Sequence, residues 1–291
     1  MAQNTVLRFV AGPQAEGQCL RDFLRFSGVS ATLIKAVKKE SGGFWAGEVP
    51  IRTCDPVHAG QCITFTLPPE PPTSVEPQQL PIRIAYESEH VMVLEKPAGM
   101  AVHPTLNYHD GTLANAYMGL LQSRGKTGVF RPVNRIDKDT SGLVLCAKNA
   151  WSASCLAQSA QKEYLAVVEG VLPKQGIIEA PIGRAPDSII LRRVDPEGKP
   201  SSTEYTAEKT VCGYTLVRAV LVTGRTHQLR VHFSYLGHPL AGDEFYGGSR
   251  ERIGRHALHC AVVSFKDPVT QMTVRVESPI PQDMEKLLQE M

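Results

Sequence analysis

NRIDKDTSGLVLCAK, residues 134–148, places a dense cluster of polar residues directly before an apolar run. Gly142 and the short polar residues before it predict a turn, and residues 143–148 predict a buried strand. Loops held by a rigid strand often carry catalytic side chains. Because Arg135 and Lys138 flank Asp137, its carboxylate is expected to stay ionised and to be able to act as a nucleophile or general base. The alternative interpretation is an Asx-type turn with Asp139 as its cap.

Basic residues surround this segment. Residues 124–148 hold six Lys or Arg against two acids, although the whole chain carries a net charge of only +2. Such a cluster fits a phosphate backbone as its partner, and it fits equally well a solvated loop with a chance excess of charge.

The composition is that of an ordinary globular protein, with 291 residues, 42% of them hydrophobic and 21% charged. No run of apolar residues is long enough to predict a membrane span, and the N-terminus lacks the pattern of a secretory signal. Seven cysteines without a CxxC pair predict a reducing cytoplasm as the location, and they argue against a disulfide scaffold or a structural zinc site.

Six prolines in residues 68–81 mark an extended linker. It divides a small module, residues 1–67, from a larger body, residues 82–291. In the module we expect helices over 18–27 and from a cap at Ser30, then strands over 44–52 and 61–67. The second of these helices carries Lys35, Lys38 and Lys39, which would suit a small RNA-binding module.

The larger body mixes strands with helices out of strict alternation, so we predict an α+β fold with a mixed, largely antiparallel sheet. The predicted strands are 90–96, 143–148, 163–169, 203–210 and 214–222. The predicted helices are 113–122, 150–161, 226–236 and 282–289.

TGRTHQLRVH, residues 223–232, is a second polar cluster. Gly224 marks a bend, and Thr226 is a candidate cap for the helix that follows. Arg225 would then lie at the entrance of the helix, where a guanidinium can reach a carboxylate in bidentate fashion. The spacing of His227 and His232 does not bring both onto one helical face, so no metal site is predicted.

Tyr164 lies in the strand KEYLAVV, residues 162–168, where alternation predicts that it shares a face with Ala166 and Val168. A buried core tyrosine is the ordinary interpretation. An aromatic ring near a carboxylate can instead stack on a base that has left its helix.

Four segments in this order, EKPAGMAVHP (95–104), NRIDKDTSGLVLCAK (134–148), KEYLAVVEG (162–170) and GRTHQLRVHFSYLGHPLAGDEFYG (224–247), closely resemble the successive signatures of the RluA family of pseudouridine synthases. RHALHCAVVSFKDP (255–268) resembles a later strand of that family. The resemblance spans about residues 82–280 and implies the pseudouridine synthase catalytic fold. More weakly, the N-terminal module resembles an S4-type RNA-binding domain.

The resemblance implies roles for individual residues. Asp137 matches the catalytic aspartate, Tyr164 the tyrosine that stacks on the target base, and Arg225 the arginine that pairs with the catalytic carboxylate. Arg135 matches a residue that, in some relatives, fills the gap left by the flipped nucleotide. Further RNA contacts are expected from Lys138, Arg230, Lys35, Lys38 and Lys39. Asn134 stands where many relatives carry His, which puts substrate contacts in doubt more than catalysis.

The implied reaction converts specific uridines in a structured ribosomal or transfer RNA to pseudouridine. This isomerisation is redox-neutral, so no nicotinamide, flavin, nucleotide or metal cofactor is expected, and the chain carries no GxGxxG or Walker motif. The carboxylate of Asp137 either attacks C1′ of the ribose or removes the 2′ proton, and the sequence does not decide between these.

Two other interpretations use the same residues differently. A carboxylate-based N-glycosidase or nuclease would let water complete the reaction and, in the first case, release free uracil. An RNA-binding factor with a dead catalytic fold is disfavoured by the presence of Asp137, Tyr164 and Arg225. A protein kinase is excluded because Asp137 does not follow the arginine directly and no glycine-rich phosphate loop is present.

Overall fold

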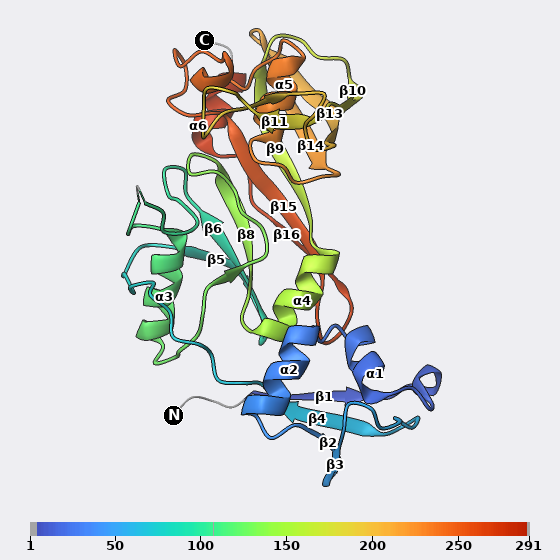
Figure 1. Ribbon diagram of the computed structural model, residues 1–291. Helices are drawn as coiled ribbons and strands as arrows, with labels where there is room; N and C mark the ends of the chain where they lie inside the picture. The colour runs from blue at the N-terminus through green and yellow to red at the C-terminus, as the bar shows by residue number, and fades with distance from the viewer. Residues whose placement is uncertain (1–4, 107, 290–291) are drawn as a thin grey trace.

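The computed structural model describes residues 5–106 and 108–289, which form a small N-terminal part and a larger body lying end to end (Figure 1). The N-terminal part contains a four-stranded antiparallel sheet, in the order β1-β4-β2-β3, and two α-helices. Its elements are β1 (Val6–Val10), a 3-10 turn (Pro13–Ala15), α1 (Leu20–Phe26), α2 (Ala31–Glu40), β2 (Phe44–Ala46), β3 (Val49–Ile51) and β4 (Cys62–Thr66).

Both helices predicted for the N-terminal part are confirmed. The Oγ of Ser30 accepts a hydrogen bond of 3.1 Å from the backbone nitrogen of Leu33, so Ser30 is the predicted cap of α2. Strand β1 was not predicted, although its side chains pack on the same small core. The exposed Val6 and Val10 explain this, because they interrupt the alternation expected of a half-buried strand.

The N-terminal core also includes a side chain from the larger body. Trp151, in α4 (Ala150–Ser159), is only 4% exposed and packs among the buried side chains of residues 7–65. Its Nε1 donates to the carbonyl oxygen of Ser27 at 3.1 Å, and its ring meets that of Phe9 edge-on at 5.5 Å. The two parts therefore share a hydrophobic core as well as a connecting segment.

The proline-rich segment 68–81 contains neither helix nor strand, as expected of a linker. It nevertheless packs against α3 (Leu113–Ser123). The backbone nitrogen of Gln78 donates to the carbonyl oxygen of Asn115 at 3.0 Å, and the side chain of Asn115 donates back to the carbonyl oxygen of Glu76 at 2.9 Å. The segment is thus tied to the body along its length.

The body is built on a ten-stranded sheet in which the path β10-β13-β14-β9-β15-β8-β6-β5 carries β16 and β7 as side branches (Figure 1). Among the strand pairs in the described part of the chain, only β15–β8 is parallel, so the predicted mixed, largely antiparallel sheet of an α+β fold is confirmed. The strands are β5 (Arg83–Glu87), β6 (Val91–Lys96), β7 (Arg131–Pro132), β8 (Ser141–Ala147), β9 (Gln161–Glu169), β10 (Gln175–Glu179), β13 (Ser202–Val211), β14 (Tyr214–Leu221), β15 (Leu258–Lys266) and β16 (Thr273–Glu277).

The remaining elements lie at one end of this sheet. They are the hairpin of β11 (Ile182–Arg184) and β12 (Arg192–Val194), the helices α5 (Gln228–Tyr235) and α6 (Gln282–Glu285), and the 3-10 turns η2 (Glu244–Tyr246) and η3 (Lys286–Leu288). The predicted helix 226–236 begins two residues later than expected, and the predicted helix 282–289 is divided between α6 and η3. Within residues 5–106 and 108–289, no helix has the length and apolar character needed to cross a membrane.

Gly142 fixes the point where the polar loop of residues 133–140 enters β8. Its φ is +113°, and a Cβ atom at this position would lie 2.3 Å from the carbonyl oxygen of Cys260 in β15. Only glycine combines that backbone conformation with so close a neighbouring strand. The loop therefore leads into the start of β8, where β8 pairs in parallel with β15.

Candidate active site

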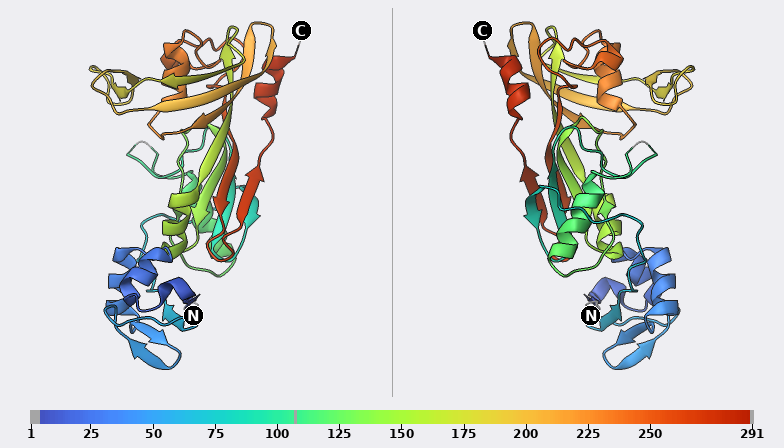
Figure 2. Two further views of the ribbon diagram at one scale, coloured as in Figure 1. Left: turned by 90° about the vertical axis from the view of Figure 1, so that its right-hand side faces the viewer. Right: turned by 90° about the vertical axis from the view of Figure 1, so that its left-hand side faces the viewer.

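A cleft of about 580 Å³ opens between the loop of residues 133–140, the cleft-facing end of β9 and the segment that leads into α5. The hairpin of β11 and β12 and the segment around residues 103–106 project from the same side of the body (Figure 2). Apolar side chains and polar side chains from the loop and α5 line the cleft together, among them Val102, Val133, Leu221, Leu258, Asp137, Tyr164 and Arg230.

Asp137 lies in the cleft with its side chain 30% exposed. Its Oδ2 is 3.3 Å from Nη1 of Arg230 and 3.8 Å from Nε2 of His227. Among the described residues, every hydrogen bond and ion pair of this carboxylate goes to Oδ2. One oxygen is thus held by protein groups, and Oδ1 is left for a molecule in the cleft.

Arg230, rather than Arg225, is the partner of Asp137. Arg230 is 5% exposed and forms a bidentate pair with Asp243, with Nε–Oδ2 at 2.7 Å and Nη2–Oδ1 at 2.8 Å. Burial lowers the pKa of its guanidinium, but the hydrogen bonds and charge of Asp243 and the charge of Asp137 outweigh burial and raise it. Arg230 therefore stays charged beside Asp137.

The predicted pairing of Arg225 with Asp137 is wrong, because α5 begins at Gln228 and Arg225 lies in the turn before it. The side chain of Arg225 is exposed and donates from Nε to the carbonyl oxygen of Pro200 at 3.3 Å. It still lines the cleft. Arg230, for which an RNA contact is predicted, also lines the cleft, but its guanidinium is buried between two carboxylates.

The side chains of Lys96 and Arg255 donate hydrogen bonds to backbone carbonyl oxygens of the polar loop. Nζ of Lys96 donates to the carbonyl oxygens of Pro97, Met100 and Lys138 at 2.9, 2.7 and 2.8 Å, and Lys96 is fully buried. Burial lowers the pKa of its ammonium, the charges of Asp139 and Asp137 partly offset this effect, and the resulting pKa is about 7. Nη1 of Arg255 donates to the carbonyl oxygen of Asp139 at 3.1 Å. Neither residue was predicted, although a lysine that ends an apolar strand was a signal for Lys96.

Asn134 shapes the same loop. Its Nδ2 donates to the carbonyl oxygen of Leu143 at 3.1 Å, and its Oδ1 accepts from the backbone nitrogen of Leu145 at 2.7 Å. The side chain is buried and tied to β8, so the replacement of a histidine by asparagine at this position bears on the backbone of the loop.

Tyr164, in β9, lines the cleft and is 5% exposed. Burial raises the pKa of its hydroxyl well above the ordinary value, with further contributions from Cys260 and from the charge of Asp137. The phenol is therefore neutral, and its ring forms part of the wall beside the carboxylate.

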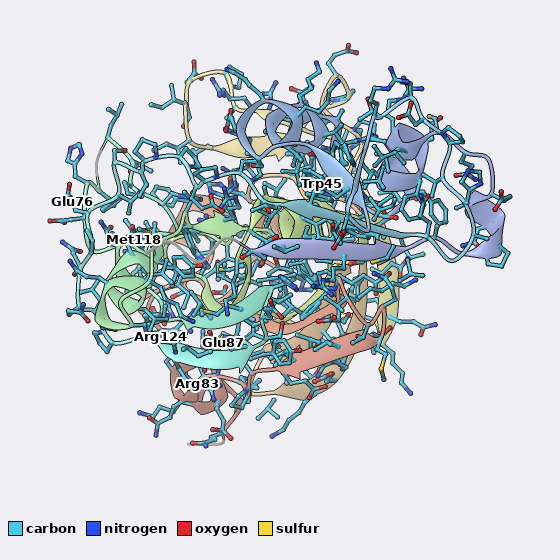
Figure 3. All side chains as sticks on the ribbon, turned by 90° about the horizontal axis from the view of Figure 1, so that it is seen from below. Trp45, Glu76, Arg83, Glu87, Met118 and Arg124 are labelled. Carbon is cyan, nitrogen blue, oxygen red and sulfur yellow. The ribbon has the colours of Figure 1, made fainter. Side chains whose placement is uncertain are left out.

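The basic residues of segment 124–148 do not act as one patch. Arg124 and Lys148 both pair with Glu87, at 2.8 and 3.1 Å, and Arg131 pairs with Glu70. Figure 3 shows Arg124 and Glu87 together, seen from the end where the N-terminal part lies. Arg135 and Lys138 alone of this set line the cleft, with Nζ of Lys138 4.1 Å from the centre of the Tyr108 ring.

Lys35, Lys38 and Lys39 are exposed on α2, at the end of the molecule opposite α5 (Figure 1). Within residues 5–106 and 108–289, no three His, Cys, Asp or Glu side chains gather in a way that would hold a metal ion.

His256 contacts the polar loop, and its protonation should make the stability of the fold depend on pH. Its Nε2 is 2.8 Å from Oγ1 of Thr140, and burial together with the charges of Arg230 and Arg255 lowers its pKa from 6.5 to about 2. Between these values the unfolded chain binds a proton that the folded chain does not, so the free energy of unfolding should fall as pH drops below 6.5, by up to about 1.4 kcal/mol per pH unit.

Urea unfolding of the wild type and of His256→Gln, which keeps a polar partner for Thr140, should show a shallower dependence of the unfolding free energy on pH in the variant. Equal slopes in the two proteins would contradict this assignment.

Comparison with known proteins agrees with this geometry. A family model described as RNA pseudouridylate synthase matches residues 90–235. The uncharacterized RNA pseudouridine synthase YjbO of Bacillus subtilis is 44% identical over 218 residues, covering 72% of this chain and 77% of that protein. The ribosomal large subunit pseudouridine synthase D of Xylella fastidiosa is 35% identical over 308 residues, covering 98% of this chain and 91% of that protein.

A solved structure supports the same relationship. The human RNA pseudouridylate synthase domain containing 1 is 28% identical and superimposes with a TM-score of 0.58, covering 72% of this chain and 86% of that one. The matched region includes Asp137, Tyr164 and Arg230, the residues that meet in the cleft. The chain therefore belongs to the RluA family of RNA pseudouridine synthases, enzymes that isomerise uridine within RNA.

Proposed function

We propose that this chain converts uridine to pseudouridine in RNA of the large ribosomal subunit, with Asp137 as the essential carboxylate. The observation that carries the proposal is the arrangement of that side chain, which lines a cleft of about 580 Å³ while its Oδ2 is held by a buried guanidinium.

The chemistry requires an ionised carboxylate beside the sugar. The N1–C1′ bond of the uridine breaks, the uracil turns, and C5 joins C1′. The proton on C5 then leaves to solvent or to a base, and N1 takes up a proton, so that the product is an isomer of uridine. In this proposal Oδ1 of Asp137 either attacks C1′ or takes the proton from C2′, and both routes need the anion beside which Arg230 lies. The uridine has to leave its stack to enter the cleft, which costs a few kcal/mol.

The buried pair of Arg230 and Asp243 serves this chemistry by keeping a fixed positive charge next to Asp137. Because Asp243 holds two N–H groups on one edge of the guanidinium, Arg230 needs no reorganisation when the substrate arrives. We infer that the ring of Tyr164 stacks on the target base, and that its neutral hydroxyl faces the region where the detached uracil turns.

The substrate is inferred from the relatives named as ribosomal large subunit pseudouridine synthases, one of which aligns with 98% of this chain. Transfer RNA is the alternative substrate. We further propose that the N-terminal part is an S4-like RNA-binding module, with Lys35, Lys38 and Lys39 directed at phosphates and with Arg135 and Lys138 contacting the backbone at the cleft. We also propose that the protein acts in the cytoplasm.

The test is to map pseudouridine in total RNA from cells that lack the protein, with and without the restored wild-type chain. We expect restoration of at least one site in the RNA of the large subunit. A parallel assay with purified protein should release no free uracil, because isomerisation keeps the base on the sugar. Free uracil without pseudouridine would show an N-glycosidase instead, and sites confined to transfer RNA would remove the ribosomal assignment.

A further inference from the structure

His227 lies beside Asp137 and has no role in the reaction as proposed above. Its imidazole stands between Asp137 and Tyr246, with Nε2 3.8 Å from Oδ2 of Asp137 and Nδ1 2.9 Å from the hydroxyl oxygen of Tyr246. The side chain is only 12% exposed. Each ring nitrogen therefore has a single defined neighbour, one of them the essential carboxylate.

The backbone of His227 is strained in a way that fixes this position. Its φ of +58° lies in the left-handed region, which only two other non-glycine residues adopt among residues 5–106 and 108–289. The residue caps α5, and its carbonyl oxygen accepts the first helical hydrogen bond, from the nitrogen of Val231 at 2.9 Å. Residues that cap helices usually have an extended backbone, and strain of this kind is concentrated at functional sites.

The Tyr246 hydroxyl determines which ring nitrogen carries the proton. Its oxygen accepts a hydrogen bond of 3.0 Å from the backbone nitrogen of Arg192, at the start of β12. With one acceptor site of its oxygen occupied, the hydroxyl can direct its proton at Nδ1 of His227, and Nδ1 is then the acceptor. A neutral imidazole whose Nδ1 accepts carries its proton on Nε2, the nitrogen that faces Asp137.

Burial keeps this ring neutral. It lowers the pKa of His227; the charge of Asp137 opposes this effect and the charge of Arg230 adds to it. Asp243 and Arg192 are the other charged groups that face the ring, and they act in opposite directions. The guanidinium of Arg230 also lies over the ring of Tyr246, at 4.9 Å from its centre, so Arg230, Tyr246 and His227 are packed together.

We propose that His227 is a positioning residue for Asp137: the neutral ring, with its proton fixed on Nε2 by Tyr246, donates a hydrogen bond to Oδ2 when the carboxylate engages the nucleotide. The distance of 3.8 Å is longer than a hydrogen bond, and catalytic hydrogen bonds commonly tighten only in the substrate complex. With Arg230 and His227 both on Oδ2, the carboxylate cannot rotate, and Oδ1 stays aimed at the sugar. This inference rests on the proposed role of Asp137.

The first test compares two substitutions of His227 in single-turnover assays with saturating RNA. Asparagine tolerates the left-handed backbone and can accept from Tyr246, but it places no donor where Nε2 was. We expect His227→Asn to lower the rate about tenfold to a hundredfold, as for a lost hydrogen bond to a charged group, with KM for RNA nearly unchanged. His227→Gln, whose longer amide can place a donor near Oδ2, should restore part of the rate. Tyr246→Phe should lower the rate less than His227→Asn.

The second test reads the proton directly. In protein labelled with ¹⁵N-histidine, the resonances absent from His227→Asn belong to His227, and their shifts report the tautomer. We expect the Nε2–H form in the wild type and a mixture of forms in Tyr246→Phe. The Nδ1–H form or a charged ring in the wild type would overturn the proposal. Wild-type rates in His227→Asn, with Asp137→Asn inactive, would overturn it while leaving the proposed function intact.

Discussion

Replacing Asp137 with asparagine is expected to slow pseudouridine formation by at least about ten-thousandfold, the scale of loss when an enzyme loses its reacting side chain. Asparagine keeps the size of aspartate but cannot attack C1′ or take a proton. The fold should persist, because Arg230 remains paired with Asp243 when Asp137 is neutral. The measurement is a single-turnover assay on an RNA that contains the target site, with binding measured separately.

Asp139→Asn is the matched control for this prediction. Asp139 follows two residues later in the same loop, and it is the carbonyl oxygen of Asp139 that meets Arg255, so its carboxylate can be neutralised without breaking that contact. We expect activity within a few-fold of the wild type. A rate for Asp137→Asn within tenfold of the wild type would remove Asp137 from the chemistry, and equal losses in both variants would point to the charge of the loop as a whole.

Replacing Arg230 with methionine is expected to damage both stability and turnover. The carboxylate of Asp243 is 1% exposed, so removal of its partner leaves an uncompensated buried charge, at a cost of about 3–5 kcal/mol of unfolding free energy. Turnover should fall as well, because Asp137 loses the cation that holds Oδ2. Urea unfolding and single-turnover rates measure the two effects in the same preparations.

A double variant separates these effects. Arg230→Met combined with Asp243→Leu removes the buried charge together with its partner and should recover much of the stability, but none of the activity. Arg250→Met is the control for loss of an arginine, since Arg250 forms only an exposed pair with Glu244. Arg225→Met tests the alternative. If it abolished turnover at saturating RNA while the stabilised double variant stayed active, the assignment of Arg230 would be wrong.

The sequence predicted the sheet and most of its helices because these depend on local periodicity. The strands at 143–148 and 163–169 and the helices at 113–122 and 150–161 repeat their apolar residues clearly, and the structure confirms them. Short edge elements such as β10 and β12 were missed, since three to five half-exposed residues carry too little pattern to be distinguished from loops.

The site shows a different limit. Asp137 and Tyr164 were predicted to share the site, and the structure brings both to the cleft. Arg225 was predicted as the partner of Asp137, and the structure has Arg230 in that place. The choice depends on where α5 begins, and helix starts are the least certain feature of a sequence-based prediction. Arg255 was out of reach for another reason: it donates to a backbone carbonyl oxygen of a loop distant in sequence, which leaves no mark on the sequence. Lys96 had a signal, its place at the end of an apolar strand, but its partners are also backbone carbonyl oxygens that the sequence does not reveal.

Trp151 bears on how the protein would select an RNA by its shape. Because this indole from the body is buried among side chains of the N-terminal part, the two parts cannot swing freely about residues 68–81. An RNA that contacted α2 and the cleft at the same time would need its phosphates and its target uridine separated by the fixed distance between these two sites. Selection among uridines would then depend on the folded dimensions of the RNA around each one, and unfolded transcripts of the same sequence would be poor substrates.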